Sequence, residues 1–224
     1  MKIAVIGKGK TGGHLLDLIP QADCIGPFGK SNPPTANNLA DADVGIVFVP
    51  GEAFLEMIPE LLNSKKPMVV GATGMEWPVG MDAELKKREM AWVHATNFSL
   101  GIQLFRQLIK TVNRMQNSLP GFKAGLLDIH HTKKLDAPSG TAKSLASWGD
   151  YPMHIDAKRE GDVVGFHEMT LTFPQETIKI SHDAHNRALF AQGAVDVAKL
   201  WKTKPLGNGL FPLENLMDHL EKHS

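Results

Sequence analysis

The side chains best suited to chemistry gather in one run, from residue 128 to residue 143. Two adjacent imidazoles, His130 and His131, are followed by the ammonium group of Lys134. Imidazoles exchange protons near neutral pH, and a lysine adds positive charge. This combination suits an anionic substrate that must also receive a proton. If this run is considered alone, it could also consist of a structural histidine and of lysines on a solvated surface.

The run continues into a Ser-Gly-Thr turn made by Ser139, Gly140 and Thr141. We interpret this turn as a helix start capped by Ser139 or Thr141, because hydroxyl side chains accept hydrogen bonds from first-turn N–H groups. Hydroxyls and helix-start N–H groups are also natural receptors for carboxylates. No metal site is expected, because adjacent histidines usually point in different directions and no cysteine or carboxylate spacing resembles a zinc motif.

A second chemical motif lies at the start of the chain. Gly7, Gly9 and Gly12 match the pattern G-x-G-x-x-G between an apolar strand and a helical stretch. Glycines at this spacing allow a tight turn, a close approach of the backbone to a pyrophosphate, and close packing of the helix whose N-terminus faces the phosphates. A merely structural turn is the alternative. The predicted dinucleotide-binding residues here are Gly7, Lys8, Gly9, Lys10, Thr11 and Gly12.

The residues after the second predicted strand bear on the choice of cofactor. NAD-specific sites usually carry an acidic residue there, about 20 residues beyond the glycines, to hold the ribose hydroxyls. This chain offers no acid from Gly26 until Asp41. Lys30 could instead contact a 2′-phosphate, although a solvated loop lysine fits equally well. The pattern favours NADPH, with NADH also usable.

Two small polar turns follow other predicted strands of the same half. In an open α/β sheet, ligands bind outside the carboxyl ends of the strands. Both turns are therefore expected to meet the cofactor near its nicotinamide, although either alone could be an ordinary turn and helix cap. The residues concerned are Gly71, Ala72 and Thr73 in the first turn and Thr96, Asn97, Phe98 and Ser99 in the second.

An α/β sheet must position these turns. The predicted strands cover residues 3–6, 22–26, 44–49, 68–70 and 92–95, and helical stretches cover residues 13–19, 53–63 and 82–90. Most of these strands are continuous apolar runs, which is typical of parallel strands covered by helices on both faces. The alternation predicts an α/β doubly wound sheet.

The pattern changes after Gly101. An amphipathic helix over residues 102–115 precedes strand-like segments at 124–129, 167–173 and 177–181, and two further helices cover 191–202 and 212–221. The last two strands alternate apolar and polar residues and are separated by a hairpin-sized gap, as in an antiparallel sheet. The prediction is a nucleotide domain (residues 1–100 plus 190–224) and a second, α+β domain (residues 101–189).

Composition narrows the class of protein. The chain has 24 Lys and Arg residues against 24 Asp and Glu residues, so it carries no overall basic field for nucleic acid. A single cysteine, Cys24, excludes an intrachain disulfide and favours a reducing compartment. Since no apolar run is long enough for a signal peptide or a membrane span, we expect a cytoplasmic protein.

The run from His130 closely resembles the signature of the dihydrodipicolinate reductase family. Other landmarks of that family follow in order across nearly the whole chain. The matching residues are the glycine turn, Gly71-Ala72-Thr73-Gly74, Asn97-Phe98-Ser99-Leu100-Gly101, His130-His131-x-x-Lys134-x-Asp136-Ala137-Pro138-Ser139-Gly140-Thr141-Ala142, Arg159-x-Gly161-Asp162-x-x-Gly165-x-His167, Ile180-Ser181-His182 and Phe190-Ala191-x-Gly193-Ala194.

The resemblance implies a Rossmann-like nucleotide-binding domain and an α+β domain that binds substrate and builds a homotetramer. It also implies binding of NADH or NADPH across the three turns and reduction of a small dicarboxylate ring in lysine biosynthesis. By position, His130 would be the proton donor or acceptor and Lys134 a second proton donor. His131 and the Gly140–Thr141 backbone would hold the substrate carboxylates, with Ser139 nearby.

The chain departs from the family pattern in its short loops, in Thr96 where alanine is common, and in the missing ribose-binding acid. Two alternatives stay open. Another Rossmann reductase, acting on amino-acid semialdehydes or imino acids, would share the glycine turn but need not carry the run from His130 to Thr141. A non-catalytic nucleotide-sensing module would have no proton donor beside its nucleotide.

Overall fold

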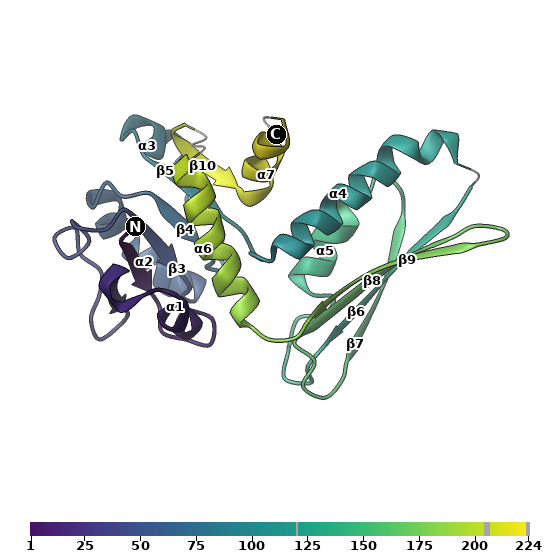
Figure 1. The fold of residues 1–224 in the computed structure, drawn as a ribbon, viewed down its shortest axis with the longest axis horizontal. Helices are drawn as coiled ribbons and strands as arrows, with labels where there is room; N and C mark the ends of the chain where they lie inside the picture. Colours follow the sequence, from purple (N-terminus) through teal and green to yellow (C-terminus); the bar gives the residue numbers. More distant parts are fainter. Residues whose placement is uncertain (120, 204–206, 223–224) are drawn as a thin grey trace. The chain divides into compact units, whose positions relative to one another are not determined.

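The computed structural model describes residues 1–119, 121–203 and 207–222. The chain divides into two compact units: Met1–Phe98 with Ala188–Ser224, called the first unit, and Ser99–Arg187, called the second unit. Figure 1 draws the first unit in purple to blue and yellow and the second mainly in teal and green. Residues 204–206, 223 and 224 of the expected first domain, and residue 120 of the expected second domain, lie outside the described residues.

A parallel sheet of six strands forms the centre of the first unit, in the order β10-β5-β4-β3-β1-β2. The predicted doubly wound sheet is confirmed. Its strands are β1 (Ile3–Ile6), β2 (Cys24–Phe28), β3 (Val44–Val47), β4 (Met68–Val70), β5 (Ala91–His94) and β10 (Gly209–Pro212). Its helices are α1 (Gly12–Leu18), α2 (Gly51–Asn63), α3 (Met81–Lys87), α6 (Ala188–Thr203) and α7 (Leu213–Lys222).

Burial on both faces explains the continuous apolar strands. Ile6 joins a core that includes Phe54 of α2 and Leu85 of α3. Val5 and Ile46 are just as fully buried but are not part of that cluster. Side chains alternate across a strand, so Val5 faces the other side of the sheet from Ile6. On that second side α6 lies against β3 and β4 and packs on α1.

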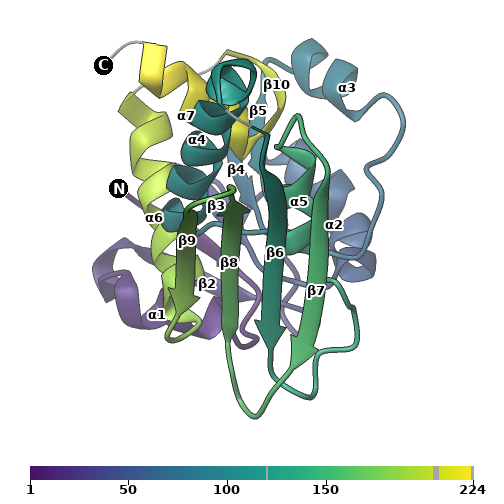
Figure 2. The same cartoon turned by 90° about the vertical axis from the view of Figure 1, so that its right-hand side faces the viewer.

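The second unit is a four-stranded sheet in the order β7-β6-β8-β9, with helices on one face. Figure 2 shows the four strands side by side with α4 and α5 behind them. Residues of both helices share one core with β6 and β8, including Phe105, Leu145 and Met169. The elements are α4 (Leu100–Met115), β6 (Lys123–His130), α5 (Gly140–Ser147), β7 (Met153–Arg159), β8 (Gly165–Thr172) and β9 (Thr177–Ala184).

The sheet of the second unit is mixed. The expected hairpin is confirmed, because β8 and β9 pair antiparallel from Thr172 and Thr177 onwards. β7, which we did not predict, pairs parallel with β6 and follows it through α5. A parallel pair needs such a crossover, so α5 is fixed against β6 by the topology.

None of the helices in the described part of the chain combines the length and the apolar character needed to cross a bilayer.

Candidate active site

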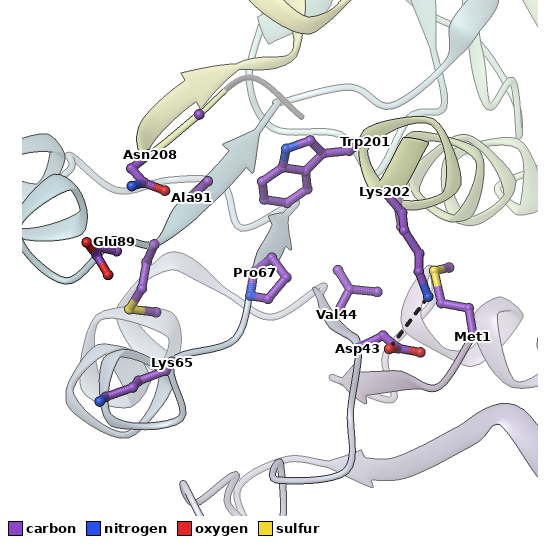
Figure 3. A pocket seen from close by; sticks show the side chains of 13 residues that line it. Met1, Asp43, Val44, Lys65, Pro67, Glu89, Ala91, Trp201, Lys202 and Asn208 are labelled. Atoms are coloured by element: carbon purple, nitrogen blue, oxygen red, sulfur yellow. Dashed lines mark ion pairs between the residues drawn. The ribbon is translucent and has the colours of Figure 1, made fainter. Parts of the chain in front are cut away.

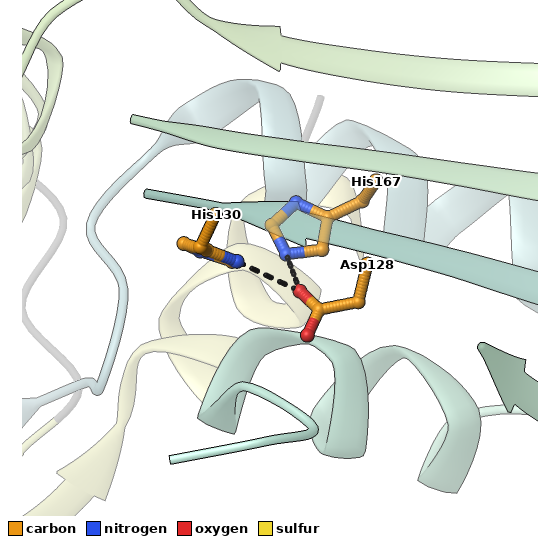
Figure 4. Close-up of side chains that lie close together, drawn as sticks. All are labelled: Asp128, His130 and His167. Carbon is orange, nitrogen blue, oxygen red and sulfur yellow. Dashed lines mark ion pairs between the residues drawn. The ribbon is translucent and has the colours of Figure 1, made fainter. Parts of the chain in front are cut away.

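A buried polar cluster lies on the helix-covered face of the second sheet. Leu126, Asp128 and His130 alternate along β6 and are all buried, so they share that face. Asp128 is in register with His167 of β8. We call Asp128, His130 and His167 the histidine cluster; Figure 4 shows both imidazoles directed at one carboxylate oxygen.

Asp128 is fully buried, and both histidines of the cluster contact its carboxylate. Its Oδ1 lies 2.9 Å from His130 Nδ1 and 3.3 Å from His167 Nε2. The Ser139 amide and hydroxyl each donate a 2.8 Å hydrogen bond to the carboxylate, and Arg159 Nη1 lies 3.6 Å from Oδ2. Burial raises the pKa of the Asp128 carboxyl, but the contacts from His130, His167 and Ser139 outweigh it and hold this pKa well below its ordinary value. Asp128 is therefore a carboxylate at neutral pH.

His130 lies between the carboxylate and a glycine. Its Nδ1 faces Asp128, but the ring is not aligned for a hydrogen bond to that oxygen. On the other side of the ring, Nε2 would be 3.1 Å from a Cβ at Gly165. A side chain at position 165 would crowd the imidazole, so glycine there leaves space beside Nε2. Nε2 is thus the ring atom that could exchange a proton with a substrate.

The polar contacts continue across the sheet to the start of α4. His167 is in register with His182 of β9, and their ring centroids are 6.2 Å apart. His182 Nε2 lies 3.1 Å from the Ser99 hydroxyl, which accepts a hydrogen bond from the Ile102 amide as the N-cap of α4. Burial lowers the pKa of His182, and the neighbouring His167 lowers it further. The Ser99 hydroxyl therefore already has a structural role, beside the cofactor contact that the sequence predicts.

The loop that carries Lys134 is held by Arg159. The Lys134 ammonium lies 2.7 Å from Asp136 Oδ1. Arg159 donates through Nε to the Lys134 carbonyl at 3.3 Å and through Nη2 to the Asp136 carbonyl. A guanidinium with several fixed donors can hold two carbonyls at once, so Arg159 fixes the loop between β6 and α5.

The predicted carboxylate receptor lies at the N-terminus of α5. Of the two predicted caps, Ser139 is the N-cap, and it accepts a hydrogen bond from the Ala142 amide at 3.1 Å. First-turn N–H groups point away from the helix body, and a Cβ built on Gly140 would meet nothing within 4 Å. His131 Nε2 lies 3.0 Å from the Arg187 guanidinium. Since arginine only donates, this nitrogen of His131 is the acceptor.

A metal ion is the other occupant that the histidine cluster could hold. Its three ligand atoms lie within 4.8 Å of one another, a spacing that suits a divalent cation. However, Arg159 lies close to the same carboxylate, and two Ser139 groups already bind it. A permanently charged guanidinium repels a cation and leaves less carboxylate charge for it. We therefore interpret the cluster as a site for handling protons.

In the first unit, the glycine turn fits a dinucleotide. A Cβ on Gly7 would lie 2.1 Å from the Phe48 carbonyl oxygen, and one on Gly12 would lie 2.2 Å from the Gly7 carbonyl oxygen. These two glycines are therefore required by the fold itself. A Cβ on Gly9 would meet nothing within 4 Å. The space in front of Gly9 is where a pyrophosphate could approach the backbone.

The other predicted turns lie at the same edge of the first sheet as the glycine turn. Gly71 follows β4, and a Cβ there would meet the Phe48 ring at 2.3 Å. Phe98 follows β5 and packs edge-on against Phe48, with centroids 5.8 Å apart. Thr73 is tied to the next loop, because its carbonyl accepts a 3.0 Å hydrogen bond from Gly51. The residues after β1, β3, β4 and β5 thus share the carboxyl edge, where α/β sheets bind ligands.

Lys30 lies just beyond β2. The Phe28 carbonyl accepts a 2.8 Å hydrogen bond from the Gly7 amide, so the end of β2 adjoins the glycine turn. Gly29 and Asn32 form reciprocal backbone hydrogen bonds, and the exposed Lys30 lies within this turn.

A cavity of about 350 Å³ lies at the opposite edge of the first sheet. It is lined near the starts of β3, β4 and β5 by Val44, Pro67 and Ala91, together with Trp201. Figure 3 shows these residues and the 3.6 Å ion pair between Lys202 and Asp43. Because the glycine turn follows the carboxyl end of β1, this cavity is not part of the nucleotide site.

Sequence reasoning assigned no site role to four charged or polar residues of the second unit, although three of them, Asp128, Arg159 and His167, lie within its motifs. Asp128 carried a signal, since it precedes His130 by two residues and a strand would place both on one face. Arg159, His167 and Arg187 belong to other elements, so only the folded chain brings them to the run that starts at Asp128. Cys24 is partly exposed on β2, and burial raises the pKa of its thiol, which disfavours a reactive thiolate.

The sequence is similar to known reductases over much or all of its length. A family model described as dihydrodipicolinate reductase, C-terminus, matches residues 101–217. A 4-hydroxy-tetrahydrodipicolinate reductase of Christiangramia forsetii is 31% identical, and the match covers 100% of this chain and 100% of that protein. A protein with the same description from Xanthomonas euvesicatoria is 35% identical over 170 residues, which cover 74% of this chain and 70% of that protein.

Solved structures share the fold at low sequence identity. The dipicolinate-bound dihydrodipicolinate reductase from Paenisporosarcina sp. TG-14 has a TM-score of 0.73 and 17% identity, covering 96% of this chain and 98% of that one. The diaminopimelate (DAP) dehydrogenase of C. glutamicum in complex with DAP has a TM-score of 0.54 and 13% identity, covering 96% of this chain and 93% of that one. At these identities the likeness concerns the fold.

Proposed function

This chain belongs to the dihydrodipicolinate reductase family, and from that premise we propose that it reduces 4-hydroxy-tetrahydrodipicolinate to tetrahydrodipicolinate in diaminopimelate and lysine biosynthesis. It is an oxidoreductase that uses a nicotinamide cofactor. The observation that carries the residue-level proposal is the arrangement of His130, the Lys134 loop and the start of α5 around one buried carboxylate.

The reaction sets three tasks for the chain. The substrate is a nitrogen-containing ring with two carboxylates, and its 4-hydroxy form loses water to give dihydrodipicolinate. The reduced nicotinamide supplies a hydride to a conjugated ring carbon. The chain must hold both carboxylates, supply one proton on the ring-nitrogen side, and offset the negative charge that develops there.

His130 and Lys134 supply the proton and the positive charge. Support for His130 is its position against a carboxylate, with Nε2 on the opposite side of the ring. Support for Lys134 is a loop fixed by Arg159, which keeps the Lys134 backbone beside the end of β6. Arg159 acts through the loop backbone and is a positioning residue.

The substrate carboxylates bind at the start of α5 and near His131. The N–H groups of Gly140 and Thr141, in the first turn, provide donors and the positive end of the helix dipole. The position of His131 in the family signature assigns it a contact with a substrate carboxylate. The Arg187 guanidinium, which contacts His131, adds a positive charge beside it. Ser139 orders this receptor by capping the helix and by binding Asp128.

The first unit is the nucleotide-binding domain and the second is the substrate-binding and oligomerisation domain. The cofactor contacts are the glycine turn, Gly71–Thr73 and Thr96–Ser99. NADPH is modestly preferred and NADH is used, because no acidic residue lies between β2 and Asp41 and Lys30 is exposed there. The open space at Gly9 supports the pyrophosphate position.

The protein assembles as a homotetramer and works in the cytoplasm. Support for assembly is the face of the second sheet that α4 and α5 leave uncovered, where Leu127 and Ile129 of β6 are half-buried apolar side chains. A single cysteine and a biosynthetic reaction support the location. Light scattering at micromolar concentration tests the assembly, and a monomeric mass would refute it without affecting the reaction.

The reaction is tested by mixing the purified protein with NADPH or NADH and freshly generated 4-hydroxy-tetrahydrodipicolinate. We expect substrate-dependent loss of reduced-nicotinamide absorbance with both cofactors. Imino acids and amino-acid semialdehydes serve as comparison substrates, and turnover of those alone would assign a different reductase activity. Nucleotide binding without oxidation by any of these substrates would favour a sensing module.

A further inference from the structure

We propose that Asp128 is a positioning residue of this reaction: it compensates the positive charge of His130 and ties that imidazole to the carboxylate receptor at the start of α5. The inference rests on the proposed function for its kinetic consequence, although the pairing itself can be observed without turnover.

The first argument is the geometry around a single carboxylate. Oδ1 faces His130 Nδ1 at 2.9 Å and accepts the Ser139 hydroxyl hydrogen bond at 2.8 Å, while Oδ2 accepts the Ser139 amide hydrogen bond at 2.8 Å. Asp128 and His130 lie on one strand, whereas Ser139 caps the N-terminus of α5. The side chain of Asp128 is therefore the direct link between the proposed proton donor and the proposed substrate receptor.

The second argument concerns charge. A fully buried carboxylate is costly unless opposite charge or several hydrogen bonds compensate it. Arg159, a permanent cation, lies 3.6 Å from the Asp128 carboxylate. An imidazole that takes up a proton gains the charge opposite to that of the carboxylate beside it. Asp128 thus stabilises His130 as a proton source, while the carboxylate itself stays ionised.

The third argument is that Asp128 directs the ring. When Nδ1 faces the carboxylate, the other nitrogen, Nε2, faces away from it towards the space left by Gly165. A ring rotation that aligns the Nδ1–H with Oδ1 would turn the 2.9 Å contact into a hydrogen bond and would fix this orientation. A carboxylate that orients an imidazole in this way sets which nitrogen exchanges the proton.

A double-mutant cycle tests whether Asp128 acts through His130. The variants are Asp128→Asn, His130→Gln and the double variant, with Asp156→Asn as the matched control because Asp156 is an exposed carboxylate on β7 of the same sheet. We expect His130→Gln to lower kcat by about 10² or more and Asp128→Asn by about 10- to 100-fold. The double variant should be about as slow as His130→Gln alone, because coupled residues are not additive. Asp156→Asn should leave kcat unchanged.

Two controls separate positioning from folding. Dinucleotide titration should give unchanged affinity for every variant, because the first unit holds the nucleotide. Asp128→Glu keeps the negative charge and should restore part of the kcat that is lost in Asp128→Asn. If Asp128→Asn does not fold, Asp128→Glu takes its place in the double-mutant cycle. Losses that multiply in the double variant would overturn the inference, since a merely structural Asp128 lowers kcat equally in both backgrounds.

An imidazole spectrum provides the readout that does not need activity. In nitrogen–proton correlation spectra of the substrate-free protein, His130 should show a slowly exchanging Nδ1–H signal that Asp128→Asn removes and Asp156→Asn leaves in place. A wild-type protein with this signal but without turnover would refute the proposed function and support the pairing. Absence of the signal from the wild-type protein would count against the pairing itself.

Discussion

The Lys134 ammonium and the Asp136 carboxylate form a 2.7 Å ion pair within the loop between β6 and α5. Asp136 is more than half exposed, whereas Lys134 is 23% exposed. The hydrogen bond from Lys134 is the main reason that the pKa of Asp136 lies below its ordinary value. The loop conformation itself does not depend on the pair, because Arg159 binds the carbonyls of both residues.

Removal of the ammonium should therefore matter far more than removal of its partner. Lys134→Ala should lower kcat by about 10² or more, the usual scale for losing an acid–base group. Asp136→Asn should lower it by less than about 10-fold, because a partly exposed ion pair contributes only about 0.2–1 kcal/mol. Steady-state kinetics of both variants, with nucleotide titration as the control, measure this difference. Near wild-type turnover in Lys134→Ala would remove Lys134 from the mechanism.

The two glycines Gly9 and Gly12 should respond differently to a methyl group. Gly12→Ala places a Cβ 2.2 Å from the Gly7 carbonyl oxygen, so it should destabilise the fold by about 1–3 kcal/mol or more. Gly9→Ala meets no protein atom within 4 Å and should leave the unfolding temperature nearly unchanged. It should nevertheless weaken dinucleotide binding by about 10-fold or more, roughly 1.4 kcal/mol. Thermal unfolding and fluorescence titration test both, and full affinity in Gly9→Ala would move the pyrophosphate elsewhere.

Lys30 should discriminate between the two cofactors. A charge-assisted hydrogen bond to a 2′-phosphate contributes about 1.5–3 kcal/mol, and an exposed lysine gives the lower end, about 10-fold in affinity. Lys30→Ala should weaken NADPH binding, leave NADH binding nearly unchanged, and lose its effect at high salt. Lys10→Ala, on the glycine turn, is the comparison and should affect both cofactors alike. Equal losses of both cofactors in Lys30→Ala would mean that Lys30 only supports its loop.

Asp128 should stabilise the folded protein at neutral pH but not in strong acid. The folded-state pKa of Asp128 is lowered, so the stabilisation is complete above the unfolded value of about 3.9 and is lost as pH falls below it. Asp128→Asn should lower the free energy of unfolding by about 1–3 kcal/mol at neutral pH. The gap from wild type should narrow below about pH 4. Denaturant unfolding across this range tests the sign, and a gap that widens in acid would contradict it.

Local sequence was sufficient to predict the layers of the first unit and the residue that caps α5. Strands β1 and β4 lie where the apolar runs at residues 3–6 and 68–70 placed them, because strands buried on both faces need continuous apolar sequence. Ser139 was readable as a helix cap, because a cap depends on the next three residues. The family resemblance was likewise readable from the sequence, because it rests on one long signature and on shorter landmarks that follow in order along the chain.

The distant residues that complete the site are brought there by the packing of the whole second unit. β7, with its alternating Met153–Arg159 sequence, has the pattern of a strand, but its partner is chosen by the crossover through α5. The register that puts His167 beside Asp128 joins residues 39 positions apart, and a shift of one residue would turn His167 to the other face. Such contacts are set by burial over the whole sheet and not by neighbouring residues. That is why roles for His130 and Lys134 could be assigned from the sequence, whereas the contacts that Asp128 and Arg159 make with them required the folded chain.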